Sequence, residues 1–188
     1  MIKIRRAKLL ALMITLALLS GCSGTARDEK NFSAWRESYL SEAEHQFAAE
    51  LEVNDSEKLC EYTILYTNND DVETVEIIEP ELVASIKAKI EGEEAALCFD
   101  GAIIEAGVSV TEKLSPMMAL PSFMKILKEG HIERVWHEKS DGRELLVSEL
   151  EMPDSTRMTL WQDSDNMQPV FAAIRAEEAV NVKIKFLK

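Results

Sequence analysis

The sequence predicts an α+β domain in which a single antiparallel sheet curls into a barrel or half-barrel. Three patterns lead to this prediction. An amphipathic helix near the N-terminus is followed by strands whose apolar residues recur at every second position. Turn residues such as Asp-Gly separate most of these strands at short intervals, as in a meander. One short apolar segment, rich in methionine, interrupts the strands and predicts a second helix.

The N-terminus matches the lipobox of bacterial lipoprotein signal peptides. Residues 1–8 carry four positive charges, residues 9–19 are uncharged and apolar, and Leu-Ser-Gly-Cys occupies 19–22. This pattern is typical of a cleaved signal peptide rather than of a membrane-spanning helix. The resemblance implies cleavage after residue 21 and lipidation of the Cys22 thiol by acyl chains such as palmitate. The alternative is an ordinary export signal with a coincidental cysteine. The mature chain is therefore expected outside the cytoplasm, anchored to a bacterial membrane by its N-terminal lipid.

The charge of the chain excludes some partners. The 188 residues carry a formal net charge of −13, and removal of residues 1–21 takes away four cations and no acid, which leaves −17. Nucleic-acid binding needs clustered Lys and Arg, so we expect no nucleic-acid partner. Anionic lipid surfaces also repel such a chain, so the lipid anchor must hold it at the membrane. Oligomeric state does not follow from the sequence.

The first part of the mature chain is predicted to be a tether followed by a helix. The lipidated cysteine and a small, polar, aperiodic stretch make up residues 22–31, which we expect to be flexible. A single domain should then fill residues 32–188. It begins with a helix at 32–51, because apolar residues recur there at spacings of three and four. Its apolar stripe is Phe32, Trp35, Tyr39, Ala43, Phe47 and Leu51.

Alternating apolar and polar residues predict the strands. A strand at 58–67 precedes the turn cluster Asn-Asn-Asp-Asp, and a strand at 72–78 ends before Pro80. Residues 81–91 fit a helical turn that runs into a strand. Three hairpins and a last strand complete the sheet of nine or ten strands, and two of the hairpins have Asp-Gly turns. These strands are expected at 95–99 and 102–106, 132–139 and 143–150, 157–161 and 170–174, and 180–186.

The inserted segment carries the candidate binding residues. Ser115 and Pro116 suit a helix start, Gly130 suits its end, and Pro121 predicts a division into a turn at 116–120 and a helix at 121–129. Methionine adapts to irregular partners, so this helix could line an apolar lipid cavity. The alternative is a helix packed into a dry core. The candidate lining residues are Met117, Met118, Leu120, Phe123, Met124 and Leu127.

Two cysteines remain in the mature chain. Cys60 and Cys98 both lie in strand-like segments, and the expected compartment permits a disulfide between them. Two free thiols that act as small apolar side chains are the other interpretation. Neither cysteine belongs to a CxxC pair, so redox catalysis and structural zinc have no support.

No residue pattern indicates catalysis or a cofactor. The sequence has no hydrolase, P-loop or dinucleotide motif, and we expect a non-enzymatic protein without a cofactor. His131 and His137 lie too far apart along one strand to share a metal ion, and His45 is expected among glutamates on the first helix. The tryptophans either pack in the core or form exposed aromatic platforms. They are Trp35, Trp136 and Trp161.

The order of elements over residues 32–188 resembles the LolA/LolB-like lipoprotein-carrier superfamily. Leu114-Ser115-Pro116 with Leu120-Pro121-Ser122-Phe123 resembles its helical insertion, and Trp161-Gln162-Asp163 with Pro169-Val170-Phe171 resembles its closing strands. The resemblance implies a curved antiparallel half-barrel. An N-terminal helix precedes the first strand, and the inserted apolar helix lies on the concave side. It also implies binding of a lipid, an acyl chain or a lipidated protein in an apolar cavity. The alternative is a protein-interaction or envelope-sensor module with the same fold and a filled core.

Overall fold

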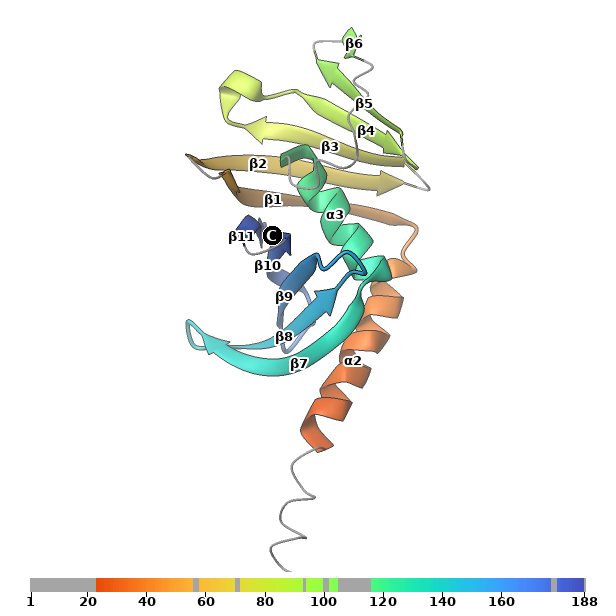
Figure 1. Cartoon of the computed structure of the whole chain (residues 1–188), viewed down its shortest axis with the longest axis vertical. Helices are drawn as coiled ribbons and strands as arrows, with labels where there is room; N and C mark the ends of the chain where they lie inside the picture. Colours follow the sequence, from red (N-terminus) through yellow and green to blue (C-terminus); the bar gives the residue numbers. More distant parts are fainter. Residues whose placement is uncertain are drawn as a thin grey trace, which may run out of the picture.

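The computed structural model describes most of the chain as a single antiparallel sheet with two α-helices (Figure 1). The described residues are 23–55, 58–69, 72–92, 94–99, 102–104, 116–176 and 179–187. Cys22 and the two turn pairs at 70–71 and 100–101 lie outside them.

The elements follow one another in a simple order along the chain. The N-terminal helix and the first six strands come first, with one 3-10 turn among them. They are α2 (Ser23–Leu40), β1 (Glu44–Asp55), β2 (Lys58–Asn69), β3 (Val72–Glu79), η2 (Glu81–Val83), β4 (Lys87–Glu91), β5 (Glu94–Phe99) and β6 (Ala102–Ile104). The inserted helix and the remaining strands are α3 (Pro116–Glu129), β7 (His131–Ser140), β8 (Arg143–Glu151), β9 (Arg157–Asp163), β10 (Pro169–Ala176) and β11 (Ala179–Phe186).

Two meanders are joined into one open sheet. Its strand order is β6-β5-β4-β3-β2-β1-β11-β10-β9-β8-β7, so β1 pairs with β11 across the middle, and β6 and β7 are the two edges. Register shifts interrupt the pairing of β2 with β3, β7 with β8, and β10 with both neighbours. Such bulges increase the local twist and help a sheet to curve. The predicted open, curved antiparallel sheet is confirmed, with eleven strands among the described residues in place of the expected nine or ten.

The predicted N-terminal helix is present, but its predicted bounds are wrong, and the flexible tether is not found at 23–31. The helix is Ser23–Leu40, so residues 23–31 are helical rather than a flexible tether, and residues 44–51 belong to β1. Apolar residues at spacings of three and four predict a helix over this stretch, and its alanines and glutamates are good helix formers. Its side chains nevertheless alternate, with Ala49, Leu51 and Val53 buried. Pairing with β2 and β11 on both sides then overrides the helix propensity.

The inserted segment is one helix, and the predicted division at Pro121 is wrong. Pro121 lies inside α3, where it lacks the N–H of a normal helical hydrogen bond. Eight residues of this helix are buried, and that burial offsets the lost bond. The helix ends as predicted at Gly130, whose N–H donates to the Ile126 carbonyl at 2.8 Å. A Cβ at Gly130 would lie 2.7 Å from the same oxygen, so glycine is needed here.

The core lies between α3 and one face of the sheet. Helix α3 packs against strands from both meanders, β1 and β3 on one side and β8 and β9 on the other. Phe123 of α3 lies with its ring centroid 6.4 Å from Phe47 and 5.1 Å from Phe186, and Phe47 lies 5.0 Å from Tyr66. These four rings connect β1, β2, β11 and α3 into one apolar cluster. Helix α2 runs beside β7 at the lower end of the molecule (Figure 1).

The predicted strands and hairpins agree closely with the structure. The turn between β7 and β8 has φ angles of 49° at Asp141 and 76° at Gly142, as the Asp-Gly pair predicts for a type I′ hairpin. The helical turn followed by a strand, expected at 81–91, is present as η2 and β4. His45, however, is not on a helix. It lies on β1 and is 6% exposed, with its ring centroid 4.6 Å from that of Tyr39.

A half-buried carboxylate marks one end of the core. Glu73 of β3 faces Asn68 across the register with β2. Burial raises the pKa of Glu73 above 4.5, and the charge of Lys128 acts in the opposite direction. Because the folded-state pKa is raised, folding favours the protonated carboxyl. The contribution of Glu73 to stability is therefore full below about pH 4.5 and is lost as the pH rises through the folded-state pKa.

We predict that Glu73→Gln makes the free energy of unfolding less dependent on pH. Glutamine resembles the protonated carboxyl, so the variant should gain stability relative to the parent between pH 4.5 and pH 7. Urea denaturation at the two pH values measures the change. The matched control is Glu129→Gln on the exposed face of α3, which should stay within about 0.5 kcal/mol of the parent at both values. The prediction would be contradicted if Glu73→Gln changed the free energy of unfolding by the same amount at both pH values.

Candidate functional site

The six candidate residues on α3 are packed into the core. Leu120, Phe123 and Leu127 are fully buried, and Met118 and Met124 are almost so. Met117 is half-buried and packs against the same cluster. None of the six lines the large groove described below. This packing matches the dry-core interpretation of the methionine-rich helix.

The two cysteines are free and half-buried. Cys60 lies on β2 and Cys98 on β5, with β3 and β4 between them. Three strand spacings separate them by roughly 14 Å, whereas the Cα atoms of a disulfide lie about 4–7 Å apart. The structure therefore contradicts a Cys60–Cys98 bridge, and the free-thiol interpretation holds.

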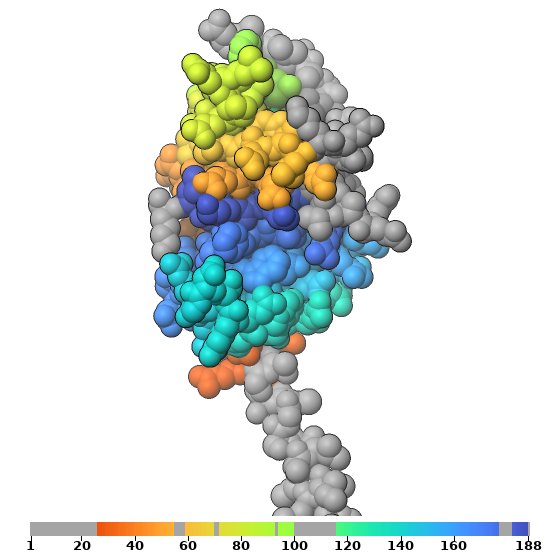
Figure 2. Space-filling view, turned by 90° about the vertical axis from the view of Figure 1, so that its left-hand side faces the viewer, coloured from red at the N-terminus to blue at the C-terminus, as the bar shows by residue number. Residues whose placement is uncertain are grey.

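A groove of about 1200 Å³ crosses the sheet on the face opposite α3. Its floor is formed by β2, β1, β11 and β10. One wall is the β3–η2 segment, and the other is formed by β9 and the β7–β8 hairpin. Figure 2 views the side of the molecule on which η2 (yellow-green) and the hairpin (cyan) lie above and below the central strands. The groove arises because outward side chains of the strands from β7 to β3 meet here, while their neighbours in sequence point to the core.

One cross-strand row runs through the groove. The strand registers align Trp136, Val147, Trp161, Phe171, Lys185, Glu50, Thr63 and Glu79 on consecutive strands from β7 to β3. The first half of this row is apolar and largely aromatic, and the second half is polar. The members from Trp161 to Glu79 line the groove and span five strand spacings, roughly 24 Å. The site is therefore long and changes in character from one end to the other.

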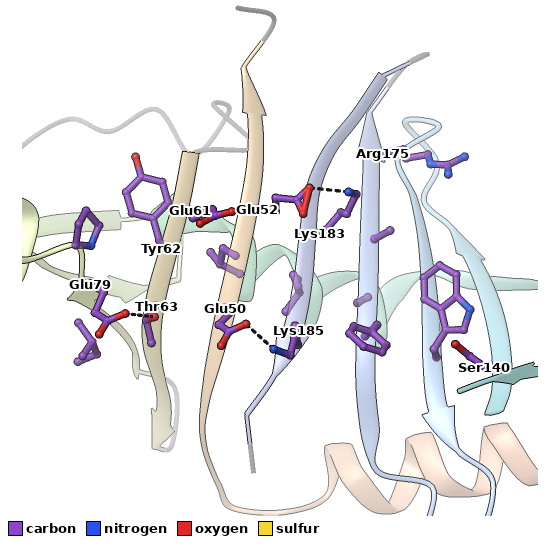
Figure 3. A pocket seen from close by; sticks show the side chains of 18 of the residues that line it. Glu50, Glu52, Glu61, Tyr62, Thr63, Glu79, Ser140, Arg175, Lys183 and Lys185 are labelled. Carbon is purple, nitrogen blue, oxygen red and sulfur yellow. Dashed lines mark hydrogen bonds and ion pairs between the residues drawn. The ribbon is translucent and has the colours of Figure 1, made fainter. Parts of the chain in front are cut away.

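Ion pairs between β1 and β11 cover the floor (Figure 3). Lys185 Nζ lies 2.7 Å from Glu50 Oε2, and Lys183 Nζ lies 2.6 Å from Glu52 Oε1. These side chains are at least one-third exposed, so each pair adds about 0.2–1 kcal/mol at most. Their main effect is to neutralise two of the carboxylates that line the groove.

The β3–η2 wall is acidic and has exposed apolar side chains. Glu79 and Glu81 line it, Glu61 lies beside it on β2, and Thr63 Oγ1 donates to Glu79 at 3.1 Å. Ile78 is 44% exposed at the bulge of β3, and Leu82 of η2 is 93% exposed. An exposed leucine alone needs no explanation, but two exposed aliphatic side chains beside a groove are typical of an interaction surface.

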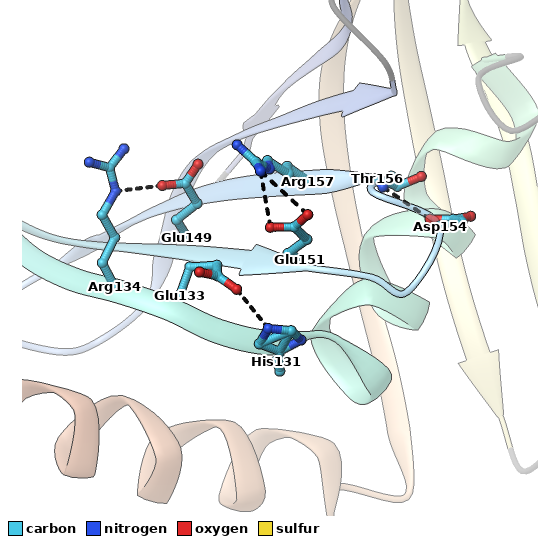
Figure 4. A network of polar contacts seen from close by, with 8 residues as sticks. All are labelled: His131, Glu133, Arg134, Glu149, Glu151, Asp154, Thr156 and Arg157. Carbon is cyan, nitrogen blue, oxygen red and sulfur yellow. Dashed lines mark hydrogen bonds and ion pairs between the residues drawn. The ribbon is translucent and has the colours of Figure 1, made fainter.

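A carboxylate holds two indoles at the opposite wall. Glu138 of β7 accepts a hydrogen bond from Trp161 Nε1 at 2.8 Å and one from Trp136 Nε1 at 3.2 Å. Phe171, 41% exposed, pairs with Trp161 across β9 and β10. The Arg134 guanidinium lies 4.7 Å from the centre of the Trp136 ring and pairs with Glu149 (Figure 4). Trp136 and Trp161 thus lie on the outer face of the sheet, whereas Trp35 packs against the core.

The sequence predicts several of the exposed side chains of this site, but not that they lie together in one groove. The alternation of β11 shows that Lys183 and Lys185 face water, and the platform interpretation of Trp161 was one of two alternatives. The pairing of β1 with β11 brings residues more than 130 positions apart into contact, which local patterns cannot reveal. Only the register identifies Glu138 as the partner of both indoles.

His131 and His137 form surface contacts, unlike the buried His45. His137 lies within 3.5 Å of Asp28 on α2 and 3.6 Å of Glu144 on β8, and His131 pairs with Glu133. Within the described ranges, no group of three or more His, Cys, Asp or Glu side chains could hold a metal ion. In the same part of the chain, no helix has both the length and the apolar character needed to cross a membrane.

The packing of α3 leads to a stability prediction. Phe123→Ala should lower the free energy of unfolding by about 3–5 kcal/mol, because it leaves a cavity beside the rings of Phe47 and Phe186. Denaturation with urea measures the loss. Lys125→Ala, on the exposed face of the same helix, is the control and should stay within about 0.5 kcal/mol of the parent. A loss below about 1 kcal/mol at Phe123 would instead indicate a side chain that borders an open cavity.

The double acceptor role of Glu138 leads to a spectroscopic prediction. Glu138→Ala removes the acceptor of both indole N–H groups and should cost about 1 kcal/mol of stability. The Nε1–H resonances of Trp136 and Trp161 should shift and exchange faster with water in NMR spectra. Trp35 donates no bond to Glu138, so its resonance is the internal control. Unchanged indole resonances at positions 136 and 161 would refute the arrangement.

No family model matches this chain, and no curated protein matches it. Solved structures do match. A domain described as that of an outer membrane lipoprotein-sorting protein from Vibrio parahaemolyticus has a TM-score of 0.55 at 11% identity, over 86% of this chain and 92% of the other. A DUF1329 family protein from Desulfovibrio piger has a TM-score of 0.51 at 10% identity, over 84% and 89%. A LolA superfamily protein from Nitrosomonas europaea has a TM-score of 0.46 at 12% identity, over 79% and 86%. At such identities the similarity concerns the fold alone, and the chain has a LolA-like fold.

Proposed function

We propose that this protein is a non-enzymatic lipoprotein of the bacterial cell envelope that binds a segment of a partner protein in its sheet groove. The lipobox at residues 19–22 supports export and anchoring through Cys22. The acidic exterior keeps the domain away from anionic lipid headgroups. The anchor then supplies the membrane attachment, and the groove supplies the recognition.

The size and charge of the groove carry this proposal. Small-molecule pockets usually measure about 300–1,000 Å³ and have few polar groups. This groove measures about 1200 Å³ and is lined by nine charged side chains. An acyl chain lying there would remove charges from water without pairing them, which is unfavourable. A peptide segment can pair its own charges and hydrogen-bonding groups with them, and it can cover the aromatic wall at the same time.

A lipid, an acyl chain or a lipidated protein beneath α3 is the second candidate. The observation that favours it is the presence of Met117, Met118 and Met124 on one helix, since methionine side chains adapt to different partners. This candidate requires α3 to move away from the sheet, because these side chains are now packed against the core. Native mass spectrometry of the full chain, purified without added lipid, would detect a bound lipid mass.

Site-directed photo-crosslinking in the native membrane tests whether a partner protein lies at the groove rather than at the exposed face of α3. A photoreactive phenylalanine analogue replaces Ser140 or Ala84, which line the groove, and Lys125, which is exposed on α3, as the matched control. We expect one protein adduct of defined mass from both groove positions and none from position 125. Mass spectrometry of the adduct identifies its class.

Two results would contradict the proposal. Adducts of equal yield from position 125 would indicate unspecific neighbours rather than a groove partner. An adduct of lipid mass, obtained with the analogue at Met117, would favour the second candidate.

The anchor has its own test. Cys22→Ser should move the protein from the membrane fraction to the aqueous fraction, because one or two acyl chains are the proposed attachment. Cell fractionation followed by immunoblotting measures the distribution. Cys60→Ser, which alters a cysteine within the fold, is the control and should leave the protein at the membrane. A Cys22→Ser protein that stays in the membrane fraction would disprove the lipid anchor.

A further inference from the structure

The groove has an excess of negative charge that the protein itself leaves unpaired. Six carboxylates and three cations line the groove. Two of the cations form ion pairs within it, Lys185 with Glu50 and Lys183 with Glu52. The remaining carboxylates belong to Glu61, Glu79, Glu81 and Glu138. Among the residues that the structure describes, none of these four forms an ion pair, and Arg175 is the one further cation of the lining. A groove of this charge attracts a cationic segment and repels an acidic one.

The same sheet face already shows how it holds an arginine. Arg134 stacks over Trp136 and pairs with Glu149, so its guanidinium combines an aromatic face with a carboxylate. Trp161 lies two strands away in the same cross-strand row and is half-buried at the edge of the groove. Glu138 lies against it, with Trp161 Nε1 donating to Glu138 Oε2. Trp161 and Glu138 thus repeat the pairing of an indole with a carboxylate, but without an arginine of this chain.

Geometry and charge together define the occupant. We propose that the groove binds an extended, arginine-bearing segment of a protein, with one guanidinium stacked on Trp161 beside Glu138 and a further cation near Glu61, Glu79 and Glu81. Arginine suits this site better than lysine because its planar guanidinium stacks on aromatic rings and pairs with carboxylates. The lining row spans roughly 24 Å, which corresponds to about seven residues of extended chain. This inference rests on the proposed function and names the chemistry of the partner.

The binding test uses the full chain in nanodiscs of zwitterionic phosphatidylcholine, with empty nanodiscs as the blank. The probes are three eight-residue peptides in which serine alternates with arginine, lysine or glutamate. Calorimetry should show binding of the arginine peptide, weaker binding of the lysine peptide and none of the glutamate peptide. A glutamate peptide that binds as well as the arginine peptide would overturn the inference.

Variants localise the binding to the groove. Trp161→Leu should lower the affinity for the arginine peptide about fivefold, and Trp161→Phe should retain most of that affinity. The double variant Glu61→Gln/Glu81→Gln should weaken it about three- to tenfold. Its matched control, Glu94→Gln/Glu129→Gln, makes the same change in net charge at exposed positions that do not line the groove. If the two double variants lost equal affinity for the arginine peptide, the attraction would depend on net charge alone, and the inference would be overturned.

Competition separates this inference from the proposed function. The arginine peptide should suppress the photo-crosslink formed from position 140. A groove crosslink that persists at saturating peptide would overturn the arginine inference and leave the proposed protein-binding function standing. Arginine-peptide binding that depends on Trp161, without any crosslinked protein, would retain the site chemistry and refute the proposed partner.

Discussion

The pairing of β1 with β11 is the contact on which the rest of the structure depends. These strands come from opposite ends of the described chain, and their ladder joins two meanders that would otherwise be separate sheets. Their alternate residues serve two different surfaces. Leu51 and Ile184 face α3, and Glu50 and Lys185 face the groove. One ladder therefore sets both the position of the core and the floor of the candidate site.

The two faces of the sheet differ in what they can accommodate. On one face, α3 and the rings of Phe47, Phe123 and Phe186 exclude water and fill the space between the meanders. On the other, aromatic and charged side chains share a single row and stay in contact with solvent. The sheet thus offers, opposite the packed α3 face, a second and more polar surface. We regard that surface as the recognition site because its charges are available to a partner.

Local patterns predicted most of the fold, and long-range pairing explains what they missed. The Asp141-Gly142 hairpin, the alternation of β11 and the glycine end of α3 each depend on neighbours in sequence, and each is confirmed. The stretch from Glu44 to Leu51 has good helix formers, yet it is a strand because β2 and β11 pair with it. The groove could not be predicted, since Glu138 and Trp161 meet only through the register of β7, β8 and β9.

The early start of α2 has a consequence for how the domain stands on a membrane. This helix begins at Ser23, directly after the proposed lipidated cysteine, and its 18 residues span about 27 Å. Arg36 Nη2 donates to the Lys128 carbonyl at 2.8 Å, and His137 lies within 3.5 Å of Asp28, so both halves of the helix contact the domain. A flexible leash would let the domain tumble at the bilayer surface. With the anchor proposed at Cys22, the docked helix would hold the groove within a narrower range of heights above the bilayer than a flexible leash would.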